Sequence, residues 1–172
     1  MLRVCTAALA LLLVGCASPG GLDGQRQHAY VFGQPELLAT QLTFGVGNAV
    51  TLLGEACIDD TKATDSYAHW GETNQAVLAE MTDTLAAHYR IPETTEDLQQ
   101  RVAEAMHLKT RLTLSTAALS DACTSLPDTL ALPSMDLAKR YEMALRDAKD
   151  PNTLKPQKLK KTDDREEQTR SE

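Results

Sequence analysis

The chain has 172 residues, 24 of them acidic and 17 basic, so its net charge is −7 at neutral pH. An acidic chain without a basic stripe is not expected to bind nucleic acid. Aromatic residues make up only 4% of the sequence, which argues against an all-β sandwich. The length fits a single folded domain with its own core.

The first fifteen residues are typical of a secretory signal. Arg3 gives a short positive start, and the apolar run from Val4 to Val14 is too short to span a bilayer, which needs about 20 residues. Leu13-Val14-Gly15-Cys16 resembles the lipobox of bacterial lipoproteins, in which the cysteine is lipidated and becomes the first residue of the mature chain. A plain signal peptide, cut after Ala10 or Ala17, is the alternative.

The resemblance implies an amino-terminus carrying two or three acyl chains, palmitate among them, attached at Cys16. Each buried methylene contributes about 0.8 kcal/mol, and two chains suffice for stable anchoring. In Gram-negative lipoproteins an aspartate after the lipidated cysteine commonly signals retention in the inner membrane. Ala17 stands there in this chain. We therefore expect a lipid anchor in the outer membrane, with the protein on its periplasmic side.

Two cysteines remain for the mature domain. Cys5 leaves with the signal and Cys16 carries lipid, so Cys57 and Cys123 are left in an oxidising compartment. Thiols in that setting are expected to pair as a disulfide. Two free thiols, or half of a metal site, are the alternatives, but cysteines this far apart lack the short spacing that metal sites use.

The two ends of the mature chain differ in composition from its middle. Residues 16–34 are rich in glycine and predict a flexible tether, whereas residues 35–149 predict the helical domain. Residues 150–172 carry dense mixed charge with few apolar side chains and predict a disordered tail. Lys158, Lys160 and Lys161 could contact anionic lipid, but the acidic residues that follow them favour a solvated tail.

The middle of the chain predicts an all-α domain, a small four-helix bundle. The first helix begins at Pro35, and the second begins near Thr64 or Asp65 and stops before Pro92. The apolar stripe of the first helix is Leu38, Leu42, Val46, Ala49, Leu53 and Ala56. The stripe of the second is Tyr67, Trp70, Asn74, Val77, Met81, Leu85 and His88. Gly45 and Gly47 weaken the first helix by about 1 kcal/mol each and indicate a kink or a close helix contact.

The third and fourth helices follow from capping residues and prolines. Thr94 and Asp97 approximate a capping box for a third helix of about 30 residues, which Pro127 ends. Ser134 caps the shorter fourth, which runs through Leu137 to Ala148. Short connections make neighbouring helices antiparallel, so the first and third end on the same side of the bundle. This topology independently brings Cys57 near Cys123.

No arrangement of residues predicts catalysis, and we expect neither an enzyme nor a bound cofactor or metal. Gly45-x-Gly47 follows no strand, and no two histidines are three or four residues apart. A bundle could hold haem between Met81 and His107, but a methionine on an apolar stripe is usually core. The acidic cluster Glu55, Asp59, Asp60 and Asp65 could hold a cation, although a solvated loop with capping residues is favoured. Trp70 and Asn74 are the one unusual pair, either a site or a core aromatic beside a buried amide.

The order of these features is similar to that of the pilotins of type II secretion. The similarity consists of a lipobox, a linker, a helix ending in cysteine, a helical hairpin and a later cysteine, and in the helical domain it covers the architecture from Leu37 to Leu145. It implies binding of an amphipathic helix from a secretin subunit in a groove, and delivery of that subunit to the outer membrane. No contact residue carries over from it.

We therefore predict a lipoprotein that binds an envelope protein. The alternatives are a bundle that binds a small molecule, haem or metal, and an immunity or inhibitor lipoprotein. Because the third helix is longer than the fourth, part of its apolar face should stay open as an interaction site. The expected surface consists of Trp70, Asn74, Val77 and Leu78 from the second helix and Leu108, Leu112 and Leu114 from the third. Tyr30, Val31 and Phe32 could instead cover it.

Overall fold

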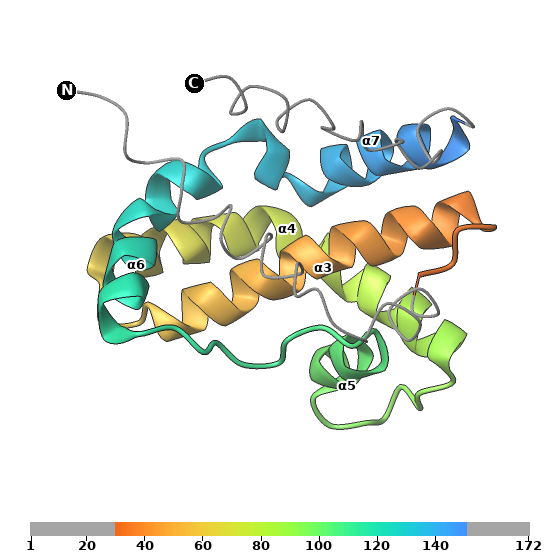
Figure 1. Ribbon diagram of the computed structural model, residues 1–172, viewed down its shortest axis with the longest axis horizontal. Helices are drawn as coiled ribbons and strands as arrows, with labels where there is room; N and C mark the ends of the chain where they lie inside the picture. Colours follow the sequence, from red (N-terminus) through yellow and green to blue (C-terminus); the bar gives the residue numbers. More distant parts are fainter. Residues whose placement is uncertain (1–29, 151–172) are drawn as a thin grey trace, which may run out of the picture.

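The computed structural model describes residues 30–150, and this part of the chain is helical and contains no strand (Figure 1). Its elements are α3 (Pro35–Ala56), α4 (Thr61–Tyr89), α5 (Leu98–Ala105), α6 (Thr116–Leu130), the 3-10 turn η1 (Pro133–Met135) and α7 (Leu137–Lys149). The all-α class is therefore confirmed. The arrangement is not the simple bundle of four helices that the sequence predicts, because the expected third helix is two helices.

Helix α3 lies at the centre of the domain. It packs against α7 along one side and against α4 on another, with α6 at its carboxyl end and α5 beside its middle (Figure 1). It begins at Pro35, as expected. Glu36 places a carboxylate in its first turn, where the negative charge interacts favourably with the positive end of the helix dipole. By length and composition α3 could cross a membrane. Within the domain, however, 67% of its most apolar window is buried, as in the core helix of a globular protein.

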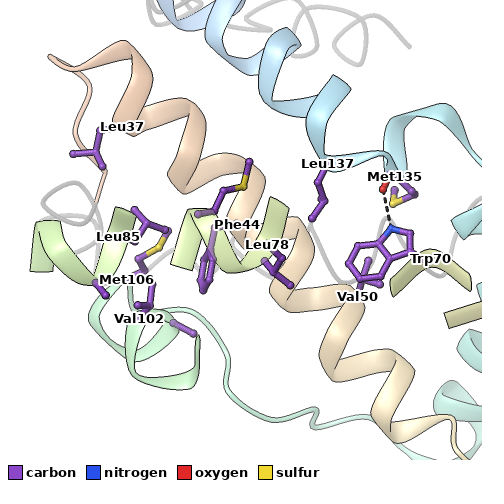
Figure 2. Close-up of a cluster of buried hydrophobic side chains, with 13 residues drawn as sticks. Leu37, Phe44, Val50, Trp70, Leu78, Leu85, Val102, Met106, Met135 and Leu137 are labelled. Carbon is purple, nitrogen blue, oxygen red and sulfur yellow. Dashed lines mark hydrogen bonds between the residues drawn. The ribbon is translucent and has the colours of Figure 1, made fainter. Parts of the chain in front are cut away.

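The core is divided into two clusters. The larger lies between α3, α4, α5 and the start of α7, and Figure 2 shows Phe44, Leu85 and Met106 meeting there. The smaller lies where the end of α3 meets α6 and the first turn of α4. Its members are Leu53, Cys57, Ala63, Ala122, Cys123 and Leu126. The sulfur atoms of Cys57 and Cys123 lie at bonding distance in this cluster, with their Cα atoms 5.4 Å apart, as the sequence predicts.

The largest difference from expectation concerns the third helix. Helix α5 ends at Ala105, and α6 begins only at Thr116. His107 adopts a left-handed conformation (φ 57°), in which its N–H bonds the Glu104 carbonyl and the Leu108 N–H bonds the Ala103 carbonyl. These two bonds are those of a Schellman motif, which ends a helix. Residues 106–115, the connector, then run beside α3 to α6 (Figure 1).

Other helix ends also differ from expectation. Helix α4 begins at Thr61 rather than near Thr64, because the Asp60 carboxylate accepts a hydrogen bond from the Ala63 N–H at 3.0 Å. Asp97 precedes α5 without a side-chain capping bond, so the expected capping box is not formed. Pro127 does not end its helix, because α6 continues to Leu130.

The last helix is also capped by another residue than expected. Asp136 caps α7 by accepting a hydrogen bond from the Lys139 N–H, whereas the expected cap, Ser134, lies in η1. Tyr30 and Val31, which we expected in the tether, pack against the larger cluster. The Val31 N–H donates to the Gln41 side chain at 2.9 Å, and this bond fixes the chain at the entrance to α3.

Candidate functional site

Trp70 and Asn74 are interior residues that join α4 to the start of α7. The exposed fractions of the two side chains are 6% and 3%. The Trp70 indole N–H donates to the Met135 carbonyl at 2.8 Å (Figure 2). The Asn74 amide donates to the Trp70 carbonyl and accepts from the Leu137 N–H at 2.7 Å. Every polar group of this pair therefore serves the fold, and the pair lines no open strip.

Leu78 is likewise buried, against Gly47 of α3. A Cβ atom added at Gly47 would lie 2.6 Å from Leu78 Cδ1, so the glycine permits a close helix contact, one of the two roles that the sequence suggested. Val77 and Leu108 are half-buried and pack against the larger cluster. The four α4 residues of the expected binding surface, Trp70, Asn74, Val77 and Leu78, thus belong to the interior or to its edge. Leu108 of the connector does so as well.

Two residues expected at this surface, Leu112 and Leu114, do line an open pocket. The pocket has a volume of about 420 Å³ and lies between the end of α3, the connector and the start of α6. Its lining residues are Leu52, Glu55, Ala56, Thr110, Arg111, Leu112, Leu114 and Leu119. The second wall of the pocket is therefore formed by α3. The sequence analysis expected the second helix, α4, to form it. The Asn48 side chain fixes that geometry by donating to the Lys109 carbonyl at 3.0 Å.

The outer side of α3 extends this apolar surface away from the pocket. Five residues recur there at alternating spacings of three and four, and none of them is charged. They are Leu42, Gly45, Ala49, Leu52 and Ala56, called here the α3 seam. Each is at least partly exposed, and Leu42 has an exposed fraction of 45%. The expected core stripe of this helix is therefore partly a surface: Leu38 and Leu53 are buried, but Leu42, Val46, Ala49 and Ala56 are not fully covered.

The interior side of α3 carries residues that the sequence reading missed. Phe44, Gln41 and Thr43 are fully buried, and the Gln41 amide donates to the Tyr89 hydroxyl at 2.7 Å. The sequence does contain a feature that predicts this burial, because no charged residue occurs between Leu37 and Gly54. A helix without charge on any face is typically buried on most sides, so a single stripe was too narrow an expectation.

Charge is distributed unevenly around the pocket. Residues 30–150 contain eighteen acidic and nine basic residues, yet residues 105–120 contain Lys109 and Arg111 and no acidic residue. Both side chains are exposed. Glu55 is the one carboxylate among the residues that line the pocket. An otherwise acidic domain thus has a locally basic border along its open apolar surface.

The residues considered for metal or haem are not brought together. In the described range 30–150, no group of three or more histidine, cysteine, aspartate or glutamate side chains could hold a metal ion. Met81 belongs to the larger cluster, whereas His107 is exposed at the end of α5. Of the acidic cluster after α3, Asp60 acts as the cap of α4. Cys16 and the lysines at 158, 160 and 161 lie outside the described residues.

No family model matches this chain, and neither a curated protein nor a solved structure matches it. The class of protein is therefore defined by its own features. It is a disulfide-bonded, all-helical domain that presents an open apolar surface.

Proposed function

We propose that this protein is an exported lipoprotein, anchored through Cys16 in the outer membrane, whose helical domain binds a protein partner in the cell envelope. The observation that carries the binding role is the open apolar surface formed by the α3 seam and the pocket. Exposed and contiguous apolar side chains on a small domain usually mark an interaction site. In this role the protein is a binding module and has no catalytic activity of its own.

The proposed location rests on the cysteines. The lipobox gives Cys16 a role as the lipidated residue, and pairing between Cys57 and Cys123 suits a compartment in which disulfides persist. The adjacent Ala17 favours the outer membrane. A lipid-anchored binding module needs only to bind its partner in order to retain it at the membrane or deliver it there. A pilotin-like or other assembly role would operate in this way.

The anchoring half of the proposal is tested with the Cys16→Ser variant. We expect the wild-type chain to partition with membranes and to carry the added mass of its acyl chains, and the variant to lose both properties. Unchanged mass and unchanged partitioning in the variant would contradict lipidation at Cys16.

The binding half is tested by placing a photo-crosslinking residue at Leu42, which is exposed at the start of the α3 seam. We expect an envelope protein to be crosslinked there and not at Ala79, an exposed alanine in the middle of α4. Equal crosslinking at both positions, or none at either, would contradict a binding role for this surface.

A further inference from the structure

The α3 seam has the spacing of a helix-packing surface. Leu42, Ala49 and Ala56 are seven residues apart, with Gly45 and Leu52 between them, so they repeat the first and fourth positions of a heptad. This alternation of three and four lines up side chains that fit between those of a second helix lying nearly parallel. Two helices covering this range would be in contact over about 21 Å, because each residue advances the helix by 1.5 Å.

Small residues on the seam favour close approach. Gly45 and Ala49 project little above the helix surface, and the nearest side-chain atom to a Cβ at Gly45 would be Leu108 Cδ1, at 3.9 Å. The connector therefore touches this part of the seam through Leu108, and Gly45 remains partly exposed. At the far end, the pocket between Leu52 and Leu112 would accept one larger apolar side chain of the incoming helix.

Charge specifies the kind of helix that fits. Lys109 and Arg111 border the seam on the connector side, and the one charged residue that α3 contributes between Leu37 and Ala56 is Glu55, at the pocket end of the seam. An incoming helix with carboxylates beside its apolar stripe would complement this border. A second copy of this chain is a poorer occupant, because its own seam is bordered by the same two cations, Lys109 and Arg111, which would meet like charge instead of carboxylates.

We propose that the α3 seam binds an amphipathic α-helix of another protein, packed lengthwise on Leu42, Ala49 and Ala56, with acidic residues flanking its apolar stripe. This inference deepens the proposed partner-binding function and rests on it. The carboxylates of the partner pair with Lys109 and Arg111, and one apolar side chain fills the pocket.

The test uses the full oxidised chain and two synthetic helical peptides of about three heptads, with leucine and alanine on the apolar stripe. One peptide carries glutamate at the flanking positions, and its twin carries lysine. We expect the glutamate peptide to bind about tenfold more tightly than the lysine peptide in a fluorescence anisotropy titration. Equal affinity of the two peptides, or no binding of either, would overturn the proposal.

Charge reversal provides the sharper variant. Lys109→Glu combined with Arg111→Glu alters exposed side chains, so the fold should be unaffected, and we expect the preference between the peptides to invert. The matched control is Lys62→Glu combined with Arg101→Glu, which makes the same change of net charge at exposed positions away from the seam. An inversion in the control as well would show that net charge alone decides, and would overturn the assignment of Lys109 and Arg111.

Ala49→Glu tests the seam itself. We expect it to abolish binding of the glutamate peptide while leaving the melting temperature within a few degrees of the wild-type value, whereas Ala79→Glu on α4 should change neither. Unchanged affinity in Ala49→Glu would overturn the proposal. So would a dimer of the free chain, measured by light scattering, that Ala49→Glu dissociates, because the seam would then be occupied by a second copy.

The outcomes also separate this inference from the proposed function. If an envelope protein copurifies equally with the wild-type chain and with Ala49→Glu, the partner-binding function stands and the seam is the wrong surface. If the glutamate peptide binds as expected and no envelope protein is crosslinked at Leu42, the surface has the stated preference but the proposed function fails.

Discussion

At the scale of single residues, buried polar side chains show how tightly the interior is specified. Asn74 uses both ends of its amide, with one hydrogen bond inside α4 and one to the first N–H of α7. Thr43 differs, because its hydroxyl is buried and is the one side-chain polar atom of this kind without a hydrogen-bond partner in the described residues. A buried polar group without a partner costs about 1–3 kcal/mol relative to a satisfied one.

Thr43→Val should therefore raise the free energy of unfolding by about 1 kcal/mol, since valine keeps the shape and removes the unsatisfied hydroxyl. The matched control is Thr82→Val in α4, where the hydroxyl donates to the Leu78 carbonyl at 2.7 Å. That variant should lose about 0.5–1 kcal/mol, because a formed bond is removed. Urea unfolding of both variants checks the opposite signs. If Thr43→Val instead lowered the free energy of unfolding, the Thr43 hydroxyl would not be destabilising the folded state.

At the scale of elements, the start of α3 and the cysteine pairing could be predicted from sequence, whereas the caps of α4 and α7 and the end of α5 could not. Pro35 marks the start of α3 as expected. The ends of α4 and α5 depend on Arg90 and His107 in the left-handed conformation, with φ values of 58° and 57°. Glycine normally signals such an end. Without it, the apolar period through residues 98–126 continues uninterrupted and predicts one long helix, and the connector that forms the pocket is missed.

The candidate site was predictable only in part for the same reason. Leu112 and Leu114 were identified as open apolar residues, but their neighbours were assigned on the assumption of that long helix. The sequence leaves Trp70 and Asn74 open as either a site or a core pair, and the tertiary hydrogen bond from the indole N–H to the Met135 carbonyl decides for the core. Periodicity identifies the apolar residues of a helix. Periodicity does not show which of two apolar sides of a helix is covered by another element. In α3, one apolar side is buried in the core and the other is the partly exposed seam.

Two of the three glycines of α3, Gly45 and Gly47, give a prediction at this scale. Gly45→Ala should raise the free energy of unfolding by about 0.5–1 kcal/mol, because alanine is the better helix former and its Cβ would make an ordinary contact. Gly47→Ala should lower it by about 1–3 kcal/mol, because its Cβ would crowd Leu78 and Leu137. Thermal unfolding of the pair checks both signs. Equal shifts in the two variants would show that close packing at Gly47 is not the reason for that glycine.

At the scale of the whole molecule, two half-buried tyrosines link stability to alkaline pH. Burial raises the pKa of Tyr67, and it also raises the pKa of Tyr89 despite the opposing hydrogen bond from Gln41. The folded state thus holds the phenol protons more tightly than the unfolded state. Their contribution to stability is complete below a pH of about 10, the unperturbed tyrosine pKa, and is lost as the pH rises through the folded values.

We therefore expect the free energy of unfolding to fall as the pH rises above about 10, and Tyr67→Phe to make this fall less steep, since phenylalanine does not ionise. Denaturant titrations of the two proteins at several alkaline pH values measure the slopes. Identical slopes would remove Tyr67 as a contributor.

The division of the core into two clusters makes the disulfide the main constraint at one end of the molecule. The cluster around Cys57 and Cys123 is small, and it holds α6 against the end of α3 and the first turn of α4. The closed loop spans 66 positions.

On the chain-entropy model the Cys57→Ser, Cys123→Ser double variant should lose about 4 kcal/mol of unfolding free energy. Because the larger cluster does not include these residues, the loss should appear first as faster hydrogen exchange in α6, while the amides around Phe44 and Leu85 stay protected. The pocket shares Leu119 of α6, so the variant should also weaken binding of the glutamate peptide. Uniform loss of protection across α3, α4 and α6 would instead mean that the two clusters unfold as one cooperative unit.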